Sequence, residues 1–495
     1  MTSPFMEKFL SRGECPKLKV YNTLSREKET FETVDEGKVR MYVCGLTVQN
    51  YSHLGHVRGA INYDVIRRYL EYKGYDVTYI SNFTDINEKI IARAELEDMK
   101  PEDLAEKYSK AFLDDLKNLN IKKADAYCKA TENIDTIQEM VETLIEKGYA
   151  YVADGNVYFS VEEFEDYGKL SGRKLDEMIA GTRKKVESDK RNPLDFALWK
   201  RVDDPEVKAW DSPWGKGWPG WHIECSAMSL KKLGKSFDIH GGGTDLIFPH
   251  HENEIAQSEA YSGVKPFVKY WLHNGTVNMS GDKMSKSLGN FYTTRELLEQ
   301  YSADQLRYFI ITKHYRSPIE YNEKEIESTN KSLEKLITTK KTMENLLNNE
   351  FDSEVNNESD LLETVRKLKH DFLTAMDDDF NTALATGVLH EISTKVNKTI
   401  NDADFVLSKE IYHQINKVNN IFNELLNILG LKLNDYDNGI NSEKFDELVN
   451  YVLNLREEAR NNKNWELADK IRDDLLDMGI KVNDTPRGTE WEIID

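Results

Sequence analysis

The first part of the chain carries the hydrophobic pattern of a strand, a helix and a second strand. Apolar residues alternate through positions 39–43, just before Cys44 and Gly45, and recur at helical spacing over positions 57–72. Positions 76–80 then have the composition of a second buried strand. These elements predict a right-handed parallel βαβ unit, in which ligands lie beyond the carboxyl ends of the strands. Cys44 falls at such an end.

The pattern is less regular over positions 130–210, which we interpret as an insertion into an α/β domain. A hairpin is predicted there around positions 149–159. Residues 210–221 hold four tryptophans together with glycine and proline, which favours an ordered loop over a linker. Regular α/β structure resumes near Glu224.

Helical periodicity dominates from about residue 323 onward. After an acidic break, amphipathic runs over residues 361–372, 383–392 and 411–425 follow the first one, and together they predict a helical bundle. The first run has one apolar stripe, made of Ile326, Leu333, Leu336, Ile337, Met343 and Leu347.

We therefore expect three parts, which suits a chain of 495 residues. The first is an α/β domain with a Rossmann-like parallel sheet over residues 1–322, including the insertion. A helical bundle follows over residues 323–433, and a small C-terminal module over residues 441–495. With 39% hydrophobic and 31% charged residues, the chain can bury a substantial core.

Charge and cysteine content narrow the class of protein further. The net charge of −21 argues against general attraction to phosphate backbones, so a nucleic-acid partner would need local basic patches. No apolar run approaches the length of a membrane span, and the first 20 residues lack the apolar run of a signal peptide. We expect a cytoplasmic protein with no membrane partner. Its four scattered cysteines are too few for a disulfide framework and are better explained as thiols or metal ligands.

The first segment with distinctive chemistry spans residues 44–56, at a strand end and leading into a helix. His53 and His56 would face one way on the first helical turn, beside backbone N–H groups that can bind phosphate. Gly55 between them would let a nucleotide approach closely. This segment alone leaves open a second explanation, a pair of surface histidines.

A second such segment spans residues 281–287. Lys283 and Lys286 lie there in a short stretch of small residues, where they can neutralise the charge on a departing pyrophosphate. Taken by itself, the segment is equally consistent with a solvated loop.

Together, the two segments resemble the two signature motifs of class I aminoacyl-tRNA synthetases. The matching residues are His53-Leu54-Gly55-His56 and the loop at residues 283–287, Lys-Met-Ser-Lys-Ser. Residues 220–228, 238–243 and 248–254 narrow the match, because they are similar to cysteinyl-tRNA synthetases. The resemblance runs through nearly the whole chain. One departure is Leu46, where the family usually has proline; it leaves the loop less constrained but keeps the sulfur and both histidines.

Four residues carry side chains that suit zinc. Cys44 and Cys225 offer thiolates, and His250 and Glu254, four residues apart on one helix face, offer an imidazole and a carboxylate. The resemblance implies these four as the ligands of one zinc ion per chain. Without it, the cysteines would be explained as two small buried hydrophobic residues, and His251 or Glu252 would compete as ligands.

A metal at this place answers a problem of selectivity. Cysteine and serine are nearly isosteric, so the shape of a pocket discriminates weakly between them. Zinc prefers sulfur, and a bound ion can take the substrate thiolate as an added ligand. The expected discrimination at the binding step removes the need for an editing domain.

The resemblance implies that the protein ligates L-cysteine to tRNA-Cys at the expense of ATP, through a cysteinyl-adenylate. His53 and His56 would hold the phosphates of ATP, and Lys286, with Lys283 nearby, would stabilise the pyrophosphate. Mg2+ is expected to accompany ATP.

Other roles also follow from the resemblance. Thr84 and Trp221 match positions that line the amino-acid pocket, whereas the residues themselves leave open a helix N-cap and a core aromatic. Residues 241–243, three glycines, would let adenosine approach, or would form a plain turn.

The bundle and the C-terminal module are expected to bind the anticodon side of the tRNA, and the protein to be a monomer. Basic residues alternate with Trp465 and Trp491 in the module, which suits phosphate contacts and base stacking. A solvated helical face is the alternative. Two rival functions remain: a paralogue that passes cysteine to an amino-sugar, whose relatives look shorter at the C-terminus, and a non-catalytic zinc- or RNA-binding derivative. Intact His53, His56 and Lys286 argue against the second.

Overall fold

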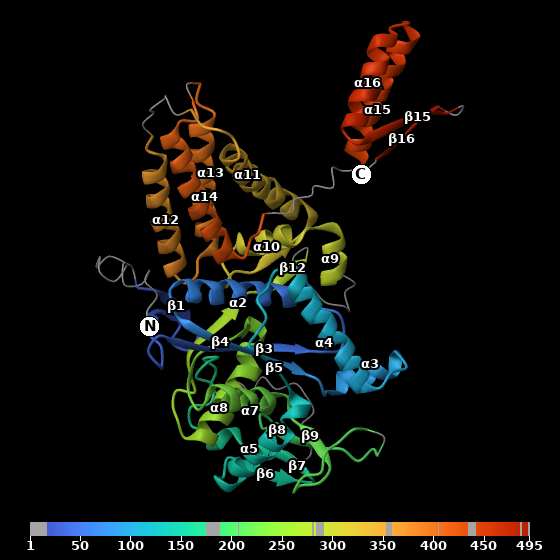
Figure 1. Cartoon of the computed structure of the whole chain (residues 1–495). Coiled ribbons are helices and arrows are strands. Elements are labelled where there is room, and N and C mark those ends of the chain that lie inside the picture. Colours follow the sequence, from blue (N-terminus) through green and yellow to red (C-terminus); the bar gives the residue numbers. More distant parts are fainter. Residues whose placement is uncertain are drawn as a thin grey trace. The chain divides into compact units, whose positions relative to one another are not determined.

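Figure 1 shows the computed structural model of the chain. The structure describes residues 17–174, 189–205, 207–279, 282–283, 292–352, 359–403, 405–433, 442–485 and 488–493. The chain divides into two units, Met1–Lys432 and Leu433–Asp495.

A five-stranded parallel sheet forms the centre of the first unit, in the order β11-β10-β3-β4-β5. Its strands are β3 (Lys38–Thr47), β4 (Asp76–Thr84), β5 (Ala126–Lys129), β10 (Phe237–Gly243) and β11 (Val268–Asn274). Helix α2 (Leu54–Tyr72) connects β3 to β4, which confirms the predicted βαβ unit and the Rossmann-like fold. Strand β3 is longer than the predicted 39–43, because it continues past Cys44.

Helices cover both faces of this sheet. Helix α2 crosses one face, and α7 (Trp221–Leu233) and α8 (Glu252–Ser262) lie on the other (Figure 1). Helices α3 (Glu88–Leu96) and α4 (Pro101–Asn118) connect β4 to β5. Between β10 and α8 the chain passes through two short turns, η3 (Thr244–Leu246) and η4 (Ile247–His251). The three glycines at 241–243 therefore end a strand and do not form a plain turn.

The insertion is a small antiparallel layer with a helix. Strands β6 (Ala150–Ala153) and β7 (Asn156–Phe159) form the predicted hairpin, whose Asp154-Gly155 turn has φ values of 46° and 79° as a type I′ turn requires. The layer, in the order β6-β7-β8-β9, is completed by β8 (Phe196–Arg201) and β9 (Gly217–Pro219), and α5 (Ile134–Glu146) precedes it.

Short elements join the parallel sheet to the bundle. Strands β1 (Lys19–Asn22) and β2 (Glu27–Thr30) form a hairpin. Strands β12 (Val277–Met279), β13 (Asp282–Lys283) and β14 (Ile319–Tyr321) form a second small sheet. Helices α9 (Thr294–Gln300) and α10 (Ala303–Ile311) lie between β13 and β14 in sequence.

Four helices form the predicted bundle: α11 (Glu323–Leu347), α12 (Leu361–Asp377), α13 (Thr382–Ile400) and α14 (Lys409–Leu429). The predicted stripe of α11 is buried at Ile326, Leu333 and Met343, because these positions face the other helices at helical spacing. Helix α14 also packs against α2 of the sheet domain, so the bundle and the sheet belong to one unit.

The second unit contains α15 (Ser442–Asn461), α16 (Trp465–Asp477) and a hairpin of β15 (Ile480–Thr485) and β16 (Gly488–Ile493). Its small core is formed by Val449, Leu453, Leu475 and Ile480. In the part of the chain that the structure describes, no helix combines the length and the apolar character needed to span a bilayer.

Candidate active site

The site begins with a bulge in β3. The register between β3 and β4 shifts between Val43 and Leu46, and the Gly45 amide donates to the Asn82 side-chain oxygen at 2.9 Å. An ideal Cβ on Gly45 would lie 1.7 Å from the Asn82 carbonyl oxygen, so only glycine fits here. Bulges redirect neighbouring side chains. This one lies beside Cys44, at the carboxyl end of the sheet.

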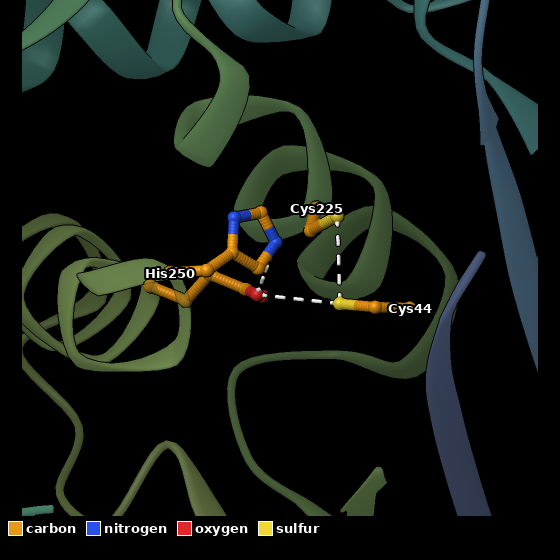
Figure 2. A group of neighbouring side chains, drawn as sticks. Cys44, Cys225 and His250 are labelled. Atoms are coloured by element: carbon orange, nitrogen blue, oxygen red, sulfur yellow. Dashed lines mark hydrogen bonds and ion pairs between the residues drawn. The ribbon is translucent and has the colours of Figure 1, made fainter. Parts of the chain in front are cut away.

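Three further donors lie near the Cys44 thiol, on α7, on η4 and on α8. Cys225 lies in the second turn of α7, His250 in η4, and Glu254 one helical turn later in α8. The two sulfur atoms are 3.7 Å apart, and Glu254 Oε1 lies 3.5 Å from Cys44 Sγ and 3.1 Å from His250 Nε2 (Figure 2). All four donor atoms lie within 4.8 Å of one another.

The chemistry of this donor set fits zinc. Two sulfur atoms, one imidazole nitrogen and one carboxylate oxygen converge, and Cys225, His250 and Glu254 are at most 2% exposed. Burial raises the pKa of Cys44, whereas the hydrogen bond with Cys44 lowers the pKa of Cys225 to about 6. Burial opposes the charge on Glu254, but His240 and His250 outweigh it and lower the pKa of this carboxyl to about 2. An ionised carboxylate and a thiol that ionises readily suit a divalent cation.

The two competing ligands that the sequence leaves open take different positions. Glu252 accepts hydrogen bonds from the amides of Leu170 and Ser171, at 3.3 and 2.7 Å, and so holds the insertion. His251 belongs to a second convergent set, with Cys44, His240 and Glu254. We favour the set with two sulfur atoms, because zinc prefers thiolates.

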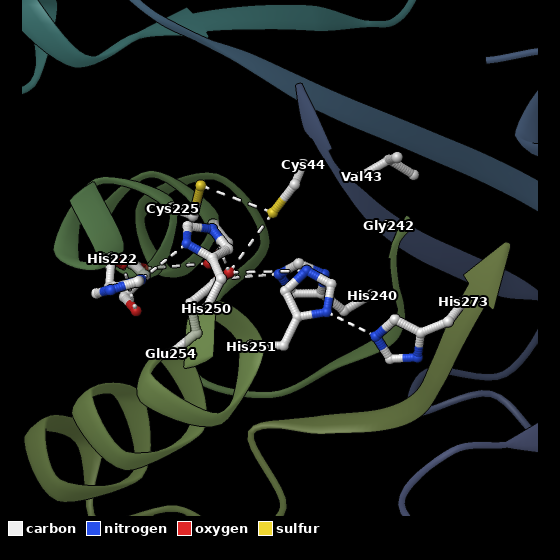
Figure 3. Close-up of polar contacts among 12 residues, drawn as sticks. Val43, Cys44, His222, Cys225, His240, Gly242, His250, His251, Glu254 and His273 are labelled. Atoms are coloured by element: carbon white, nitrogen blue, oxygen red, sulfur yellow. Dashed lines mark hydrogen bonds and ion pairs between the residues drawn. The ribbon is translucent and has the colours of Figure 1, made fainter. Parts of the chain in front are cut away.

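Three buried histidines, His240, His251 and His273, and the partly buried His222 surround the four donors, and the sequence analysis missed their role. His240 Nε2 lies 2.9 Å from Glu254 Oε2, His222 Nδ1 lies 2.9 Å from His250 Nδ1, and His251 Nδ1 lies 2.7 Å from His273 Nε2 (Figure 3). Such outer partners orient metal ligands. A signal exists in the sequence, since five of the chain's 11 histidines fall between residues 222 and 273.

The two histidines of the first signature lie at the N-terminus of α2. The His53 ring accepts a hydrogen bond from the Gly55 amide at 3.0 Å and stacks on the His56 ring, with centroids 3.7 Å apart. The rings therefore do face one way, as the spacing predicts. A Cβ on Gly55 would lie 2.8 Å from His53 Cε1, so this glycine makes room for the imidazole as well.

The structure describes one of the two lysines of the second signature. Lys283 ends β13, where it pairs with Asn278 of β12. Lys286 lies outside the described residues.

The two predicted pocket residues flank the donor set. Thr84 ends β4 and donates to Glu224 Oε2 at 2.9 Å; it is not a helix cap, because Asn87 caps α3. Trp221 begins α7 with its ring 4.3 Å from the His250 ring, and it is 40% exposed, so it is not a core aromatic. The buried carboxyl of Glu224 was also missed by the sequence analysis, and burial raises its pKa.

Comparison with solved structures defines the fold. The fold is similar to that of a methionyl-tRNA synthetase from Mycobacterium tuberculosis bound by methionyl-adenylate, with a TM-score of 0.60 and 14% identity over 79% of this chain and 90% of that one. A putative arginyl-tRNA synthetase from Campylobacter jejuni gives a TM-score of 0.56 and 13% identity, over 81% of this chain and 94% of that one. Together with the paired histidines at the sheet edge, this is the fold of a class I aminoacyl-tRNA synthetase.

Sequence comparison identifies the family. Residues 30–331 match the model of the class I (C) tRNA synthetase catalytic domain, residues 371–434 a DALR domain, and residues 442–491 the cysteinyl-tRNA ligase anticodon binding domain. The chain is 49% identical to a cysteine–tRNA ligase of Thermococcus onnurineus, over 96% of this chain and 99% of the relative. A cysteine–tRNA ligase of Geobacillus thermodenitrificans is 47% identical over the same shares. The chain belongs to the cysteine–tRNA ligase family.

Proposed function

We propose that the protein ligates L-cysteine to tRNA-Cys in two steps, through a cysteinyl-adenylate. The observation that carries this proposal is the buried cluster of Cys44, Cys225, His250 and Glu254, at the sheet edge of a chain that belongs to this family. A pocket for an amino acid whose side chain is a thiol needs such donors, because shape alone cannot reject serine.

In this proposal the four donors hold one zinc ion. When bound, zinc lowers the pKa of a coordinated thiol and accepts sulfur in preference to a hydroxyl. His240 supports the site by holding the far oxygen of Glu254 at 2.9 Å, which leaves the near oxygen directed at Cys44 and His250. Trp221, whose ring lies against His250, forms a half-exposed wall beside the donors.

The chain's other residues position ATP and the carboxylate of cysteine. In the first step this carboxylate attacks the α-phosphorus, and the bond to pyrophosphate breaks, so catalysis depends on alignment and charge stabilisation. His53 and His56, stacked at the N-terminus of α2, are placed to hold the phosphates. Lys283 and Lys286 would stabilise the pyrophosphate, with Mg2+ bound to the nucleotide.

We assign tRNA binding to the C-terminal module, on the strength of the anticodon-binding model that residues 442–491 match. Binding by the bundle stays a prediction from the resemblance. Within the module, the Trp465 side chain is 57% exposed and suits stacking on a base. Arg456 is 5% exposed and Trp491 packs on the module core, so these two do not suit free RNA contacts. A monomeric state and a cytoplasmic location stay predictions.

The experiment is cysteine-dependent exchange of pyrophosphate into ATP, repeated with serine and with a zinc chelator, followed by charging of tRNA-Cys. We expect exchange with cysteine, none of comparable efficiency with serine, and loss of exchange after chelation that added zinc restores. Comparable exchange with serine would contradict selection by the metal. Exchange without any charging of tRNA would favour the rival that passes cysteine to an amino-sugar.

A further inference from the structure

A buried arginine stands directly behind the paired histidines. Arg58, two residues after His56 on α2, is 0% exposed. Its guanidinium donates to three backbone carbonyls: Thr276 at 2.7 Å, Tyr315 at 3.1 Å and Ser317. Burial lowers the pKa of Arg58 to about 10, so the group keeps its charge near neutral pH. A buried charge held by carbonyls is costly unless its geometry is well fixed.

The three carbonyls belong to two segments that lead into strands of the small sheet, one before β12 and one before β14. Thr276 directly precedes β12, the strand that pairs with β13 and so places the backbone of Lys283. Tyr315 and Ser317 lie just before β14, and the Gly275 amide donates to the Tyr315 carbonyl at 2.9 Å. A Cβ on Gly275 would lie 2.5 Å from the Ser317 carbonyl oxygen, so the two segments pack as closely as backbones allow.

Tyr315 also reaches in the opposite direction, to the bundle. Its hydroxyl donates to Asp379 at 2.9 Å, and the Arg316 Nε donates to the same carboxylate at 2.7 Å. Asp379 lies in the turn between α12 and α13 and is 0% exposed, and it also accepts the Tyr21 amide at 2.8 Å. One residue, Tyr315, therefore binds Arg58 through its carbonyl and Asp379 through its hydroxyl.

The backbone of this turn is strained. Asp379 and Phe380 have φ values of 64° and 52°, the left-handed region that residues other than glycine rarely adopt. Such conformations persist where surrounding contacts hold them, and they are concentrated at functional sites. Here those contacts include the hydrogen bonds of Asp379.

A second set of hydrogen bonds links Thr294, on the C-terminal side of the segment with Lys283 and Lys286, to the N-terminal end of α2. The Thr294 amide donates to the Ser52 carbonyl at 2.8 Å, and the two hydroxyl oxygens lie 2.6 Å apart. The chain before residue 284 is thus bound through Thr276 to Arg58 of α2, and the chain after residue 291 is bound through Thr294 to Ser52, which directly precedes His53. The Arg58 tie continues through Tyr315 to Asp379 of the bundle.

We propose that Arg58, Tyr315 and Asp379 are positioning residues for adenylate formation, which fix the strand pair carrying Lys283 relative to His53 and His56. Through these residues, the turn between α12 and α13 affects adenylate formation without contacting the substrates. This inference rests on the proposed function. It assigns to the bundle a part in the first step of the reaction, in addition to the predicted binding of tRNA.

The test measures kcat and KM of cysteine-dependent pyrophosphate exchange for Asp379→Asn and Arg58→Lys. Asparagine turns an NH2 group toward Arg316 or Tyr315, and lysine cannot reproduce the planar fork that binds three carbonyls. We expect kcat to fall by about 10- to 100-fold, the loss typical of a displacement of about 1 Å. The KM for cysteine and the zinc content should stay within about twofold of the wild type, because the metal cluster is not touched.

Asp378→Asn is the matched control. Asp378 adjoins Asp379 in the same turn, but its side chain is 50% exposed and pairs with Lys28 at the surface. This variant should keep wild-type kcat. Tyr315→Phe removes only the hydroxyl that reaches Asp379, so it tests the same link with little risk to folding, and its kcat should fall by at least about threefold.

The double variant Arg58→Lys/Asp379→Asn decides whether the residues act together. Residues that act through a shared partner show non-additive effects, so the double variant should lose less than the product of the two single losses. Multiplicative losses would overturn the proposal. Wild-type kcat in Asp379→Asn or Tyr315→Phe, with only a lower melting temperature, would also overturn it. The contact between Tyr315 and Asp379 would then serve stability alone. An inactive wild-type protein would overturn the proposed function itself, and this inference with it.

Discussion

Gly45→Ala tests whether the bulge in β3 positions the metal ligand. The added Cβ would lie 1.7 Å from the Asn82 carbonyl oxygen, whereas real Cβ atoms essentially never come within 3.0 Å of a heavy atom outside their own residue and its chain neighbours. Because the obstacle is backbone, β3 and β4 must part by more than about 1 Å. Zinc sites tolerate deviations of only about 0.2 Å from a bond of about 2.3 Å to sulfur. The neighbouring residue, Cys44, would be carried out of bonding range.

We expect Gly45→Ala to lose most of its zinc and to be less stable by about 1–3 kcal/mol, the usual cost of overpacking. Metal analysis of the purified variant and thermal unfolding measure the two effects. Gly387→Ala is the matched control: it lies in α13, a Cβ there meets nothing within 4 Å, and alanine should raise the stability by about 0.5–1 kcal/mol. A Gly45→Ala protein with full zinc content and unchanged KM for cysteine would refute the role that we give to the bulge.

Two further predictions concern the metal and pH. Cys225→Ser should lower bound zinc and raise the KM for cysteine by at least about 10-fold, since it removes a sulfur donor. Cys128→Ser changes a buried cysteine that is outside the donor set, so it should keep both the zinc content and the KM. Unchanged zinc content in Cys225→Ser would remove Cys225 from the ligand set. Burial opposes ionisation of Asp379, but hydrogen bonds from His314 and the Tyr21 amide and the charge of Arg316 outweigh it, so its pKa lies below the ordinary 3.8. The stability that Asp379 contributes is therefore present above that value and is lost as pH falls below it, so the gap in melting temperature between the wild type and Asp379→Asn should narrow from about pH 6 to about pH 3. A gap that widens toward low pH would contradict this sign.

The elements that follow a strict hydrophobic period were predictable from the sequence. The period of 3.6 residues outlines α11 and α14, since their apolar positions face one core. The predicted strand at 39–43 stops too early, because Cys44 and Gly45 interrupt the alternation at the bulge. A bulge depends on how a second strand packs, which one strand's pattern does not contain.

In the candidate site, residue types were predictable from the sequence, but their geometry was not. The resemblance implied the four metal donors, whereas the residue types alone could not separate His250 from His251, which are adjacent in sequence. The geometry of the irregular turn η4 favours His250, since it brings His250 Nε2 to 3.1 Å from Glu254 Oε1 and leaves His251 Nε2 at 4.0 Å. The role of Arg58 was equally hidden, because its acceptors are backbone carbonyls more than 200 residues away in sequence.

The way in which the donors are held bears on how the protein can select a thiol. Cys225 belongs to a hydrophobic cluster that includes Met228, Ile255 and Trp271, and α7 and α8 are held against the sheet by this core. Small zinc domains, by contrast, lack such a core and fold only with the metal. Here the core and the bulge of β3 place the donors, so the binding energy of the metal is not needed to organise the fold. In the proposed function, the free energy of a bond between zinc and the substrate thiolate would then be expressed as discrimination against serine.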